Sequence, residues 1–207
     1  MIRKTLDTDI PAVMAIYDAA RDFMRAHGNA TQWPEGTPSA EQLAADIAAG
    51  GSYVCEVDGR VVATFAFLPG PDECYDVIED GQWRSDTPYA VLHRVASDGT
   101  VHGVAAAMFA FAKERADHLR IDTHQDNLPM QGAIAKARNE ARTGTVCEVI
   151  VEGFDGNSGR YVGRSYGEAA EIDGVILFTS SRELRAGEFV PVKITQALEY
   201  DLIGEEL

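Results

Sequence analysis

The segment from Tyr89 to Asn127 constrains this chain more than any other part of its sequence. A short apolar strand, Val91–Ala96, runs into a glycine-bearing loop at Ser97–Gly103, and that loop opens directly into an apolar helix at Val104–Ala116. The first backbone amides of a helix have no partner within the helix and lie at the positive end of its dipole. The segment therefore predicts an anion site of a kind that suits a pyrophosphate group.

The residues before this segment predict a strand, two helices and a hairpin. A strand is expected at Ile2–Leu6, and Asp9 is the expected cap of the first helix. That helix carries an apolar stripe at helical spacing, made of Ile10, Val13, Met14, Tyr17, Ala20 and Met24. Ser39 begins a second helix as part of a capping box. The dipeptide Asp58-Gly59 then joins two strands, because it favours the tight turn of a hairpin.

A strand at Leu119–Asp122 and a helix from Leu128 complete the pattern. The order strand, two helices, hairpin, strand, helix, strand, helix resembles that of the GNAT N-acetyltransferases. The most specific matching residues are His93–Ser97 and Asp122–Asn127, followed by Met130. The resemblance covers residues 2–136 and implies an α/β (α+β) fold with a mixed, mostly antiparallel sheet. It also implies acetyl-CoA as cofactor and a primary amine as substrate, so we expect residues 1–136 to form an acetyl-CoA-binding domain.

The resemblance assigns the cofactor to one strand and one loop. In this family the strand matching Val91–Ala96 pairs with the pantetheine arm, and the loop matching Asp98–Ala105 holds the pyrophosphate. The implied cofactor-binding residues are Val95, Ala96, Gly99, Thr100, Val101, His102, Gly103, Val104, Ala105 and Asn127. Thr100 stands where the family has Gln or Arg, and Ile134 stands where it often has a proton-donating tyrosine. The chain also continues as helix over residues 135–140, where a GNAT has a Gly-Phe turn and two further strands.

Three side chains are candidates for catalysis at the acceptor site: His124, Glu79 and Tyr75. His124 follows a strand at its carboxyl end, where clefts open in such sheets, although a hydrogen bond that fixes the loop is the alternative. Tyr75 and Glu79 lie in a polar segment expected to face the acceptor, and they match a Tyr-Asp-x-Ile-Glu run of one bacterial GNAT subgroup. His93 lies on an apolar strand and is interpreted as a hydrogen-bonded core histidine rather than a base.

From Thr145 the pattern changes to short strands separated by turn glycines. The expected strands cover residues 145–152, 160–165, 175–179, 189–195 and 200–203. Such spacing predicts a small closed β-barrel. The segment resembles a TRAM domain, an OB-like all-β barrel, and is most similar to the C-terminal barrel of radical-SAM methylthiotransferases that modify a ribosomal protein. Matching residues are 149–153, 161–165, 169–174, 191–194 and 199–204. The barrel domain is expected at 137–207, and the two family patterns meet inside one continuous helix, near Met130–Gly132.

Charge narrows the choice of partner for this barrel. Residues 138–207 hold 7 basic and 13 acidic residues, within a chain whose net charge is −15. This balance disfavours phosphate-rich partners, so nucleic-acid binding is expected to be weak. The resemblance implies docking to a ribosomal protein, with Tyr161, Arg164 and Tyr166 as exposed candidates, although Tyr161 has core packing as its alternative. A barrel that merely covers the open edge of the preceding sheet is another interpretation.

The cysteines and the apolar runs indicate a cytoplasmic protein without a metal or a membrane span. Cys55, Cys74 and Cys147 lack CxxC or Cys/His ligand spacing. No apolar run reaches the length of a membrane span, and the first residues do not look like a secretory signal. A Cys-x-x-x-Cys-x-x-Cys motif for an iron–sulfur cluster does not occur. The predicted function is N-acetyl transfer to a primary amine of a small molecule or protein. The alternative is a non-catalytic binding module that docks to a ribosomal protein or RNA, and a homodimer is left open.

Overall fold

The computed structural model describes residues 1–78, 83, 85–168 and 174–207. It divides into two compact units, Met1–Asn127 and Leu128–Leu207, which are described separately. Glu79 and most of the 169–174 match to the TRAM barrel lie outside the described residues. The domain boundary expected between residues 136 and 137 stays a prediction. Among the described residues, no helix is both long enough and apolar enough to cross a bilayer.

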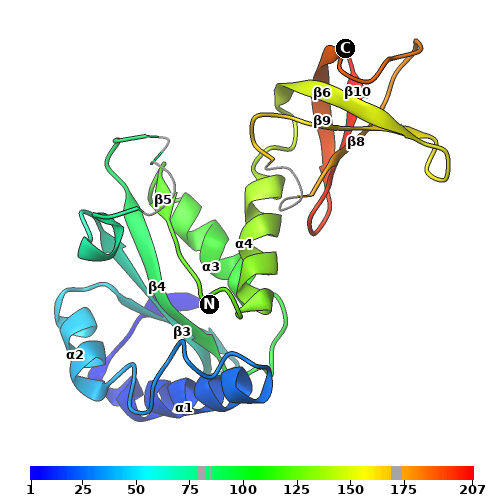
Figure 1. Ribbon diagram of the computed structural model, residues 1–207. Coiled ribbons are helices and arrows are strands. Elements are labelled where there is room, and N and C mark those ends of the chain that lie inside the picture. The colour runs from blue at the N-terminus through cyan, green and yellow to red at the C-terminus, as the bar shows by residue number, and fades with distance from the viewer. Residues whose placement is uncertain (79–82, 84, 169–173) are drawn as a thin grey trace. The chain divides into compact units, whose positions relative to one another are not determined.

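The first unit is a five-stranded sheet with helices (Figure 1). Its elements are β1 Ile2–Lys4, η1 Asp7–Asp9, α1 Ile10–Ala26, α2 Ala40–Ala48, β2 Ser52–Val57, β3 Arg60–Pro69, η2 Glu73–Tyr75, β4 Ala90–Ser97, α3 Val104–Lys113 and β5 Leu119–Arg120. The strand order is β1-β2-β3-β4-β5, with antiparallel neighbours up to β4 and a parallel pair of β4 and β5. The predicted mixed, mostly antiparallel sheet is confirmed.

The backbone of the turn between β2 and β3 explains why Asp58 and Gly59 alone predict the hairpin. Asp58 has φ 51° and Gly59 has φ 75°, so both lie in the left-handed region. Two successive left-handed residues give a turn whose twist matches that of the flanking strands, and Asp-Gly supplies them at low cost. The predicted hairpin is therefore confirmed together with its turn.

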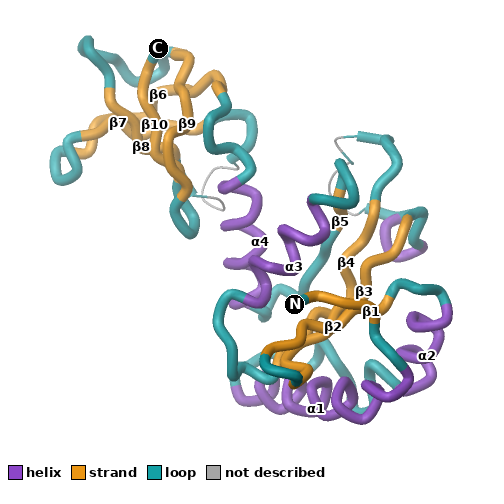
Figure 2. Tube along the Cα trace, turned by 180° about the vertical axis from the view of Figure 1, so that it is seen from behind, coloured by secondary structure: helices purple, strands orange, loops and turns teal. Residues whose placement is uncertain are grey.

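Helices pack on both faces of the sheet (Figure 2). On one face, the predicted apolar stripe of α1 packs with Leu43 of α2 and Val54 of β2, which confirms the stripe as core. On the other face, Phe111 of α3 packs edge-on against Tyr53 and Phe65, because neighbouring residues of a strand point to opposite faces. The expected capping of α1 by the side chain of Asp9 is wrong. Its carboxylate instead accepts hydrogen bonds from the Arg3 guanidinium and from the backbone N–H of Leu6.

The second unit is a helix followed by a closed five-stranded barrel. Its elements are α4 Leu128–Glu140, β6 Val146–Asp155, β7 Arg160–Arg164, β8 Ile176–Thr179, β9 Phe189–Ala197 and β10 Leu202–Glu206. The barrel order is β10-β8-β7-β6-β9, and its core includes Val149, Phe178 and Ile194. All five predicted strands and the closed barrel are confirmed. The predicted continuous helix is also confirmed, since α4 runs through Gly132 without a break.

Candidate functional site

The loop between β4 and α3 bends through two glycines with left-handed backbone. Gly99 has φ 73° and Gly103 has φ 81°, conformations that glycine adopts readily. A Cβ added at either position would meet no heavy atom within 4 Å, so both positions face open space. The backbone N–H of Ala107 donates to the Gly103 carbonyl at 3.1 Å, and the amides of residues 104–106 therefore precede the hydrogen-bonded ladder of α3. These amides and the helix dipole together can bind an anion.

Arg60, at the start of β3, brings a positive charge into this loop. Its Nη1 lies 2.7 Å from Asp98 Oδ2, and its Nη2 donates to Thr100 Oγ1 at 2.7 Å. Burial acts to raise the pKa of Asp98. Hydrogen bonds from Thr100 and the charge of Arg60 outweigh it and hold that pKa below its usual value. Thr100 stands where the family has Gln or Arg, and the positive charge comes instead from Arg60 on the neighbouring strand, which the sequence pattern did not predict.

Strand β4 is irregular a few residues beyond its pairing with β5. The register with β3 shifts between the pairs Thr64–Ala96 and Ala66–His93, and Arg94 in this bulge has φ 52°. Strand β4 pairs with β5 through Ala90–Leu119 and Val91–Arg120 only, within the described part of the chain. The pairing of the two parallel strands therefore ends at Val91, within the described residues. Nothing in the sequence pattern indicated a bulge at an arginine.

A polar network surrounds His93 beside the point where the two strands part. His93 Nε2 lies 3.0 Å from Asp72 Oδ2, and its Nδ1 lies 3.9 Å from Asp122 Oδ1. The hydroxyl of Tyr75 donates to Asp122 Oδ1 at 2.7 Å, and the Tyr75 ring stacks on the imidazole at 5.8 Å between centroids. Desolvation, followed by the hydrogen bond to Asp122, raises the pKa of Tyr75 above its usual range, so this hydroxyl keeps its proton. His93 is thus hydrogen-bonded, as interpreted from sequence, but its partners are carboxylates.

The predicted catalytic residues fall in different places. Tyr75 belongs to the His93 network, whereas Glu79 lies outside the described residues. His124 Nε2 lies 3.3 Å from Thr31 Oγ1, and its Nδ1 accepts from the Asp126 backbone N–H at 3.2 Å. These contacts match the alternative of a loop-fixing hydrogen bond. Asn127 Nδ2 donates to Gln32 Oε1 at 2.9 Å, which ties the loop after β5 to the segment after α1.

Two further members of the His93 network, Asp72 and Cys74, were not predicted from the sequence. Asp72 accepts from the Cys74 backbone N–H at 2.9 Å as well as contacting His93. Burial acts to raise the pKa of Asp72, but the hydrogen bonds from Cys74 and His93 hold it below the usual value. The role of Asp72 could not be predicted because this residue lies in a polar segment without periodicity. The contact between this segment, which follows β3, and His93 of β4 cannot be predicted from local residue types.

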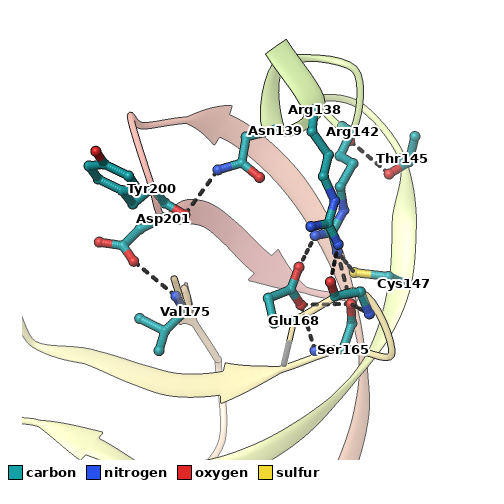
Figure 3. Close-up of polar contacts among 11 residues, drawn as sticks. Arg138, Asn139, Arg142, Thr145, Cys147, Ser165, Glu168, Val175, Tyr200 and Asp201 are labelled. Atoms are coloured by element: carbon teal, nitrogen blue, oxygen red, sulfur yellow. Dashed lines mark hydrogen bonds and ion pairs between the residues drawn. The ribbon is translucent and has the colours of Figure 1, made fainter. Parts of the chain in front are cut away.

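In the second unit, a buried ion pair links the end of α4 to the barrel (Figure 3). Arg142 pairs with Glu168 and donates to Ser165 Oγ at 2.9 Å. The second carboxylate oxygen of Glu168 accepts from the Ser165 backbone N–H and hydroxyl, both at 2.8 Å. From α4 itself, Asn139 Nδ2 donates to the carbonyl of Tyr200 at 3.0 Å. Polar contacts thus orient the helix end against the loop after β7 and the turn before β10.

The expected docking residues of the barrel differ in exposure. Tyr161 packs against the barrel core, and its hydroxyl accepts from the Leu184 backbone N–H at 3.1 Å, so core packing is its role. Arg164 pairs with Glu152 across β6 and β7. Tyr166 is 87% exposed, and Phe154 and Phe189 are also exposed. The barrel therefore exposes single aromatic side chains, whereas Tyr161 belongs to its core.

The barrel matches a known family and known proteins. Residues 143–206 match the TRAM domain. The chain is 52% identical over 79 residues to the ribosomal protein uS12 methylthiotransferase RimO of Desulforamulus reducens, which covers 38% of this chain and 18% of that protein. It is 44% identical over 87 residues to the protein of the same name from Thermoanaerobacter sp., covering 42% of this chain and 20% of that protein. The chain thus spans about a fifth of the length of the curated relatives it matches, in its C-terminal region.

Solved acetyltransferases resemble the rest of the chain. An acetyltransferase of the GNAT family from Streptococcus agalactiae superposes with a TM-score of 0.60 and 28% identity, over 66% of this chain and 83% of that one. A GNAT-family acetyltransferase from Listeria monocytogenes superposes with a TM-score of 0.52 at 15% identity, over 79% of this chain and 92% of that one. The expected GNAT-like fold, followed by a TRAM barrel, is therefore confirmed.

Proposed function

We propose that the first unit is an N-acetyltransferase that moves an acetyl group from acetyl-CoA to a primary amine of a small molecule or protein. The observation that carries this proposal is that β4 pairs with β5 only up to Val91 and then runs on to a loop that opens into the N-terminus of α3. Positioning two reactants side by side supplies much of the rate of such a transfer. The 28% identity to a GNAT-family acetyltransferase supports the proposal.

The residues of the loop fit the cofactor. Gly99 and Gly103 leave space where a side chain would stand, and the first amides of α3 point a positive dipole at the same place. Val101–Ala105 and Arg60 would hold the pyrophosphate. The backbone at Val95 and Ala96 would pair with the pantetheine arm, and Asn127 would border the acyl end. When bound, acetyl-CoA supplies an activated thioester that an unprotonated amine can attack.

The His93 network is the proposed place of acid–base chemistry. His93 would accept a proton from the amine at a ring nitrogen, and Asp72 would fix the ring orientation from 3.0 Å. Tyr75 would act as a positioning residue, because its own hydroxyl holds Asp122. His124 and Glu79 remain the alternative candidates from sequence. His124 Nδ1 already accepts a backbone hydrogen bond, which makes His93 the better candidate.

Calorimetry with acetyl-CoA and CoA tests the proposal. Ala105→Glu places a carboxylate in the first turn of α3, where it stabilises the helix by about 0.3–1 kcal/mol while repelling a pyrophosphate. We expect this variant to lose cofactor binding without losing stability, and Ala105→Gln to keep most of the affinity. A protein that gives no heat and no thermal shift with either ligand is not an acetyltransferase.

Two histidine variants separate the candidate bases. His93→Gln is expected to lower kcat/KM by about 100-fold or more at unchanged CoA affinity. His124→Gln should have a smaller effect through the loop that it ties to Thr31. The reverse order would assign the base to His124. Cofactor binding with no turnover over a broad panel of amines would favour the alternative, a binding module without catalysis.

A second function is proposed for the barrel, docking to a basic protein such as a ribosomal protein. It is favoured by the TRAM match and by exposed aromatic residues on an acidic unit, among them Tyr166. Three cysteines free of disulfides are consistent with a cytoplasmic setting. Pull-down with the full chain, against Tyr166→Ala and Phe154→Ala variants, tests docking. RNA binding that resists high salt, or no retained protein, would contradict it.

A further inference from the structure

Three side chains with metal-binding atoms converge beside β4. Asp72, Cys74 and His93 each offer one ligand atom, and these atoms all lie within 4.8 Å of one another. Asp72 and Cys74 come from the segment at η2, whereas His93 comes from the middle of β4. We propose that these residues bind a divalent cation of the zinc class. A bound ion occupies His93 Nε2, so the metal-bound chain does not use His93 as the base proposed above. The spacing of these residues in the sequence does not indicate a metal site, because His93 joins the other two only through the antiparallel pairing of β3 and β4.

The set of donor atoms selects zinc among common cations. Thiolate, imidazole and carboxylate are the ligands that zinc takes in proteins, and three of them leave a fourth position for water. Tetrahedral coordination places ligand atoms roughly 3.3–3.8 Å apart. The closest pair, His93 Nε2 and Asp72 Oδ2, is 3.0 Å apart. Cys74 is exposed, so its side chain can rotate to complete the site without disturbing the core.

His93 is already oriented as a metal ligand. Its ring lies nearly parallel to that of Tyr75, at an interplanar angle of 6°, and Tyr75 is only 5% exposed. Its Nδ1 faces Asp122 at 3.9 Å, so Nε2 points to Asp72. Asp122 lies behind the imidazole at a distance longer than a hydrogen bond. A small movement would bring it to the place of the carboxylate that usually fixes a zinc-bound histidine.

The charges around the cluster favour a cation. Within the described parts of the chain, the carboxylates of Asp72 and Asp122 lie near His93, and no Lys or Arg lies within ion-pair distance of either one. On binding, the S–H bond of Cys74 breaks, a sulfur–metal bond forms, and the proton passes to the solvent.

Cobalt and zinc titrations of the full chain test the site. Co²⁺ should give the thiolate-to-metal charge-transfer absorption of a tetrahedral site, which Zn²⁺ then removes by displacement. Calorimetry with Zn²⁺ should give one ion bound per chain. Zinc should also protect Cys74 of the wild-type chain from alkylation, as read by mass spectrometry, and this measurement needs no variant.

Variants assign the ligands independently of acetyl transfer. Cys74→Ser should abolish the charge-transfer band, and Asp122→Asn should weaken binding by about 10- to 100-fold. Cys147→Ser is the matched control, because that thiol lies on β6 of the other unit. A band that survives Cys74→Ser, or one that disappears with Cys147→Ser, would overturn the site. So would alkylation of Cys74 at the same rate with and without zinc.

Discussion

Arg94 and Asp46 are joined by two hydrogen bonds, from Nε to Oδ2 at 2.7 Å and from Nη2 to Oδ1 at 2.9 Å. Arg94 stands in the bulge of β4 with φ 52°, and Asp46 lies on α2 with 5% exposure. A non-glycine residue in this conformation costs roughly 1–3 kcal/mol and persists only when its surroundings fix it. The ion pair to α2 therefore fixes the bulge at which the register of β4 with β3 shifts.

Removing the acidic partner should destabilise the first unit. Asp46→Asn leaves the Arg94 guanidinium largely buried beside a neutral group, and breaking such a pair costs about 3 kcal/mol. Urea unfolding followed by tryptophan fluorescence measures it, since Trp33 and Trp83 both lie in this unit. Asp22→Asn is the control, because Asp22 pairs with Arg25 at 3.5 Å on the surface of α1. That change should cost less than about 0.5 kcal/mol. Equal losses in both variants would contradict the role of the pair.

Arg60 and Asp98 should have opposite effects on cofactor affinity. Arg60→Gln removes a charged donor from the loop and should weaken CoA binding by about tenfold. Asp98→Asn keeps the oxygen that accepts from Thr100, removes a negative charge near the phosphates, and frees Arg60. It should therefore tighten binding, and the gain should shrink in high salt. Calorimetry at two salt concentrations measures both. Arg25→Gln is the neutral control, and weaker binding in Asp98→Asn would place the phosphates elsewhere.

Much of the fold could be predicted because its signals are local. The turn at Asp58-Gly59, the stripe on α1 and the strands of the barrel each depend on neighbouring residues, and each was confirmed. The side chain of Asp9 failed as a cap because Arg3 competes for it across the start of the sheet. A capping rule weighs only the first residues of the helix, so an ion pair to a residue six positions earlier can overturn it.

The site was harder to predict than the fold. The loop into α3 was found from glycine placement, whereas Arg60, Asp72 and Cys74 were missed. Arg60 lies on β3, and Asp72 and Cys74 lie in the segment that joins β3 to β4, so the pairing of these two strands brings all three residues to the site. The register of that pairing includes a bulge at Arg94. A bulge at a non-glycine residue leaves no local mark in the sequence. The carboxylates around His93 therefore became visible only in three dimensions.

A methyl group at Gly163 should break the barrel locally. A Cβ there would lie 2.4 Å from the Ile150 carbonyl oxygen and 2.6 Å from Val149 Cγ1. Gly163→Ala should therefore cost about 1–3 kcal/mol through overpacking between β6 and β7. Amide hydrogen exchange of β7 measures it, because the barrel contains no tryptophan. Gly156→Ala is the matched control, since a Cβ at that turn meets nothing within 4 Å. Similar exchange in both variants would contradict the close packing of β6 against β7.

The ion pair of Arg142 and Glu168 should make barrel stability depend on pH. Burial acts to raise the pKa of Glu168, but hydrogen bonds from Arg142 and Ser165 outweigh it and hold that pKa below 4.5, the ordinary value for glutamate. A carboxyl group with a lowered folded-state pKa stabilises the fold above its unfolded pKa, and this contribution is lost as the pH falls through the folded value. The pH range in which the barrel loses this stabilisation therefore lies below about 4.5.

Glu168→Gln tests this window directly. At pH 7 the variant should lose about 3 kcal/mol of barrel stability, because Arg142 keeps its charge without a carboxylate. The gap between wild type and variant should narrow as the pH falls below about 4.5, since the wild-type carboxylate then becomes protonated too. Ser165→Ala is the control: it removes the hydroxyl hydrogen bonds but keeps the ion pair, so it should lose less stability and retain the pH dependence. Hydrogen exchange of the barrel amides over a pH series measures all three proteins. A gap between wild type and Glu168→Gln that stays constant down to strongly acidic pH would show that this carboxylate is not ionised in the folded barrel.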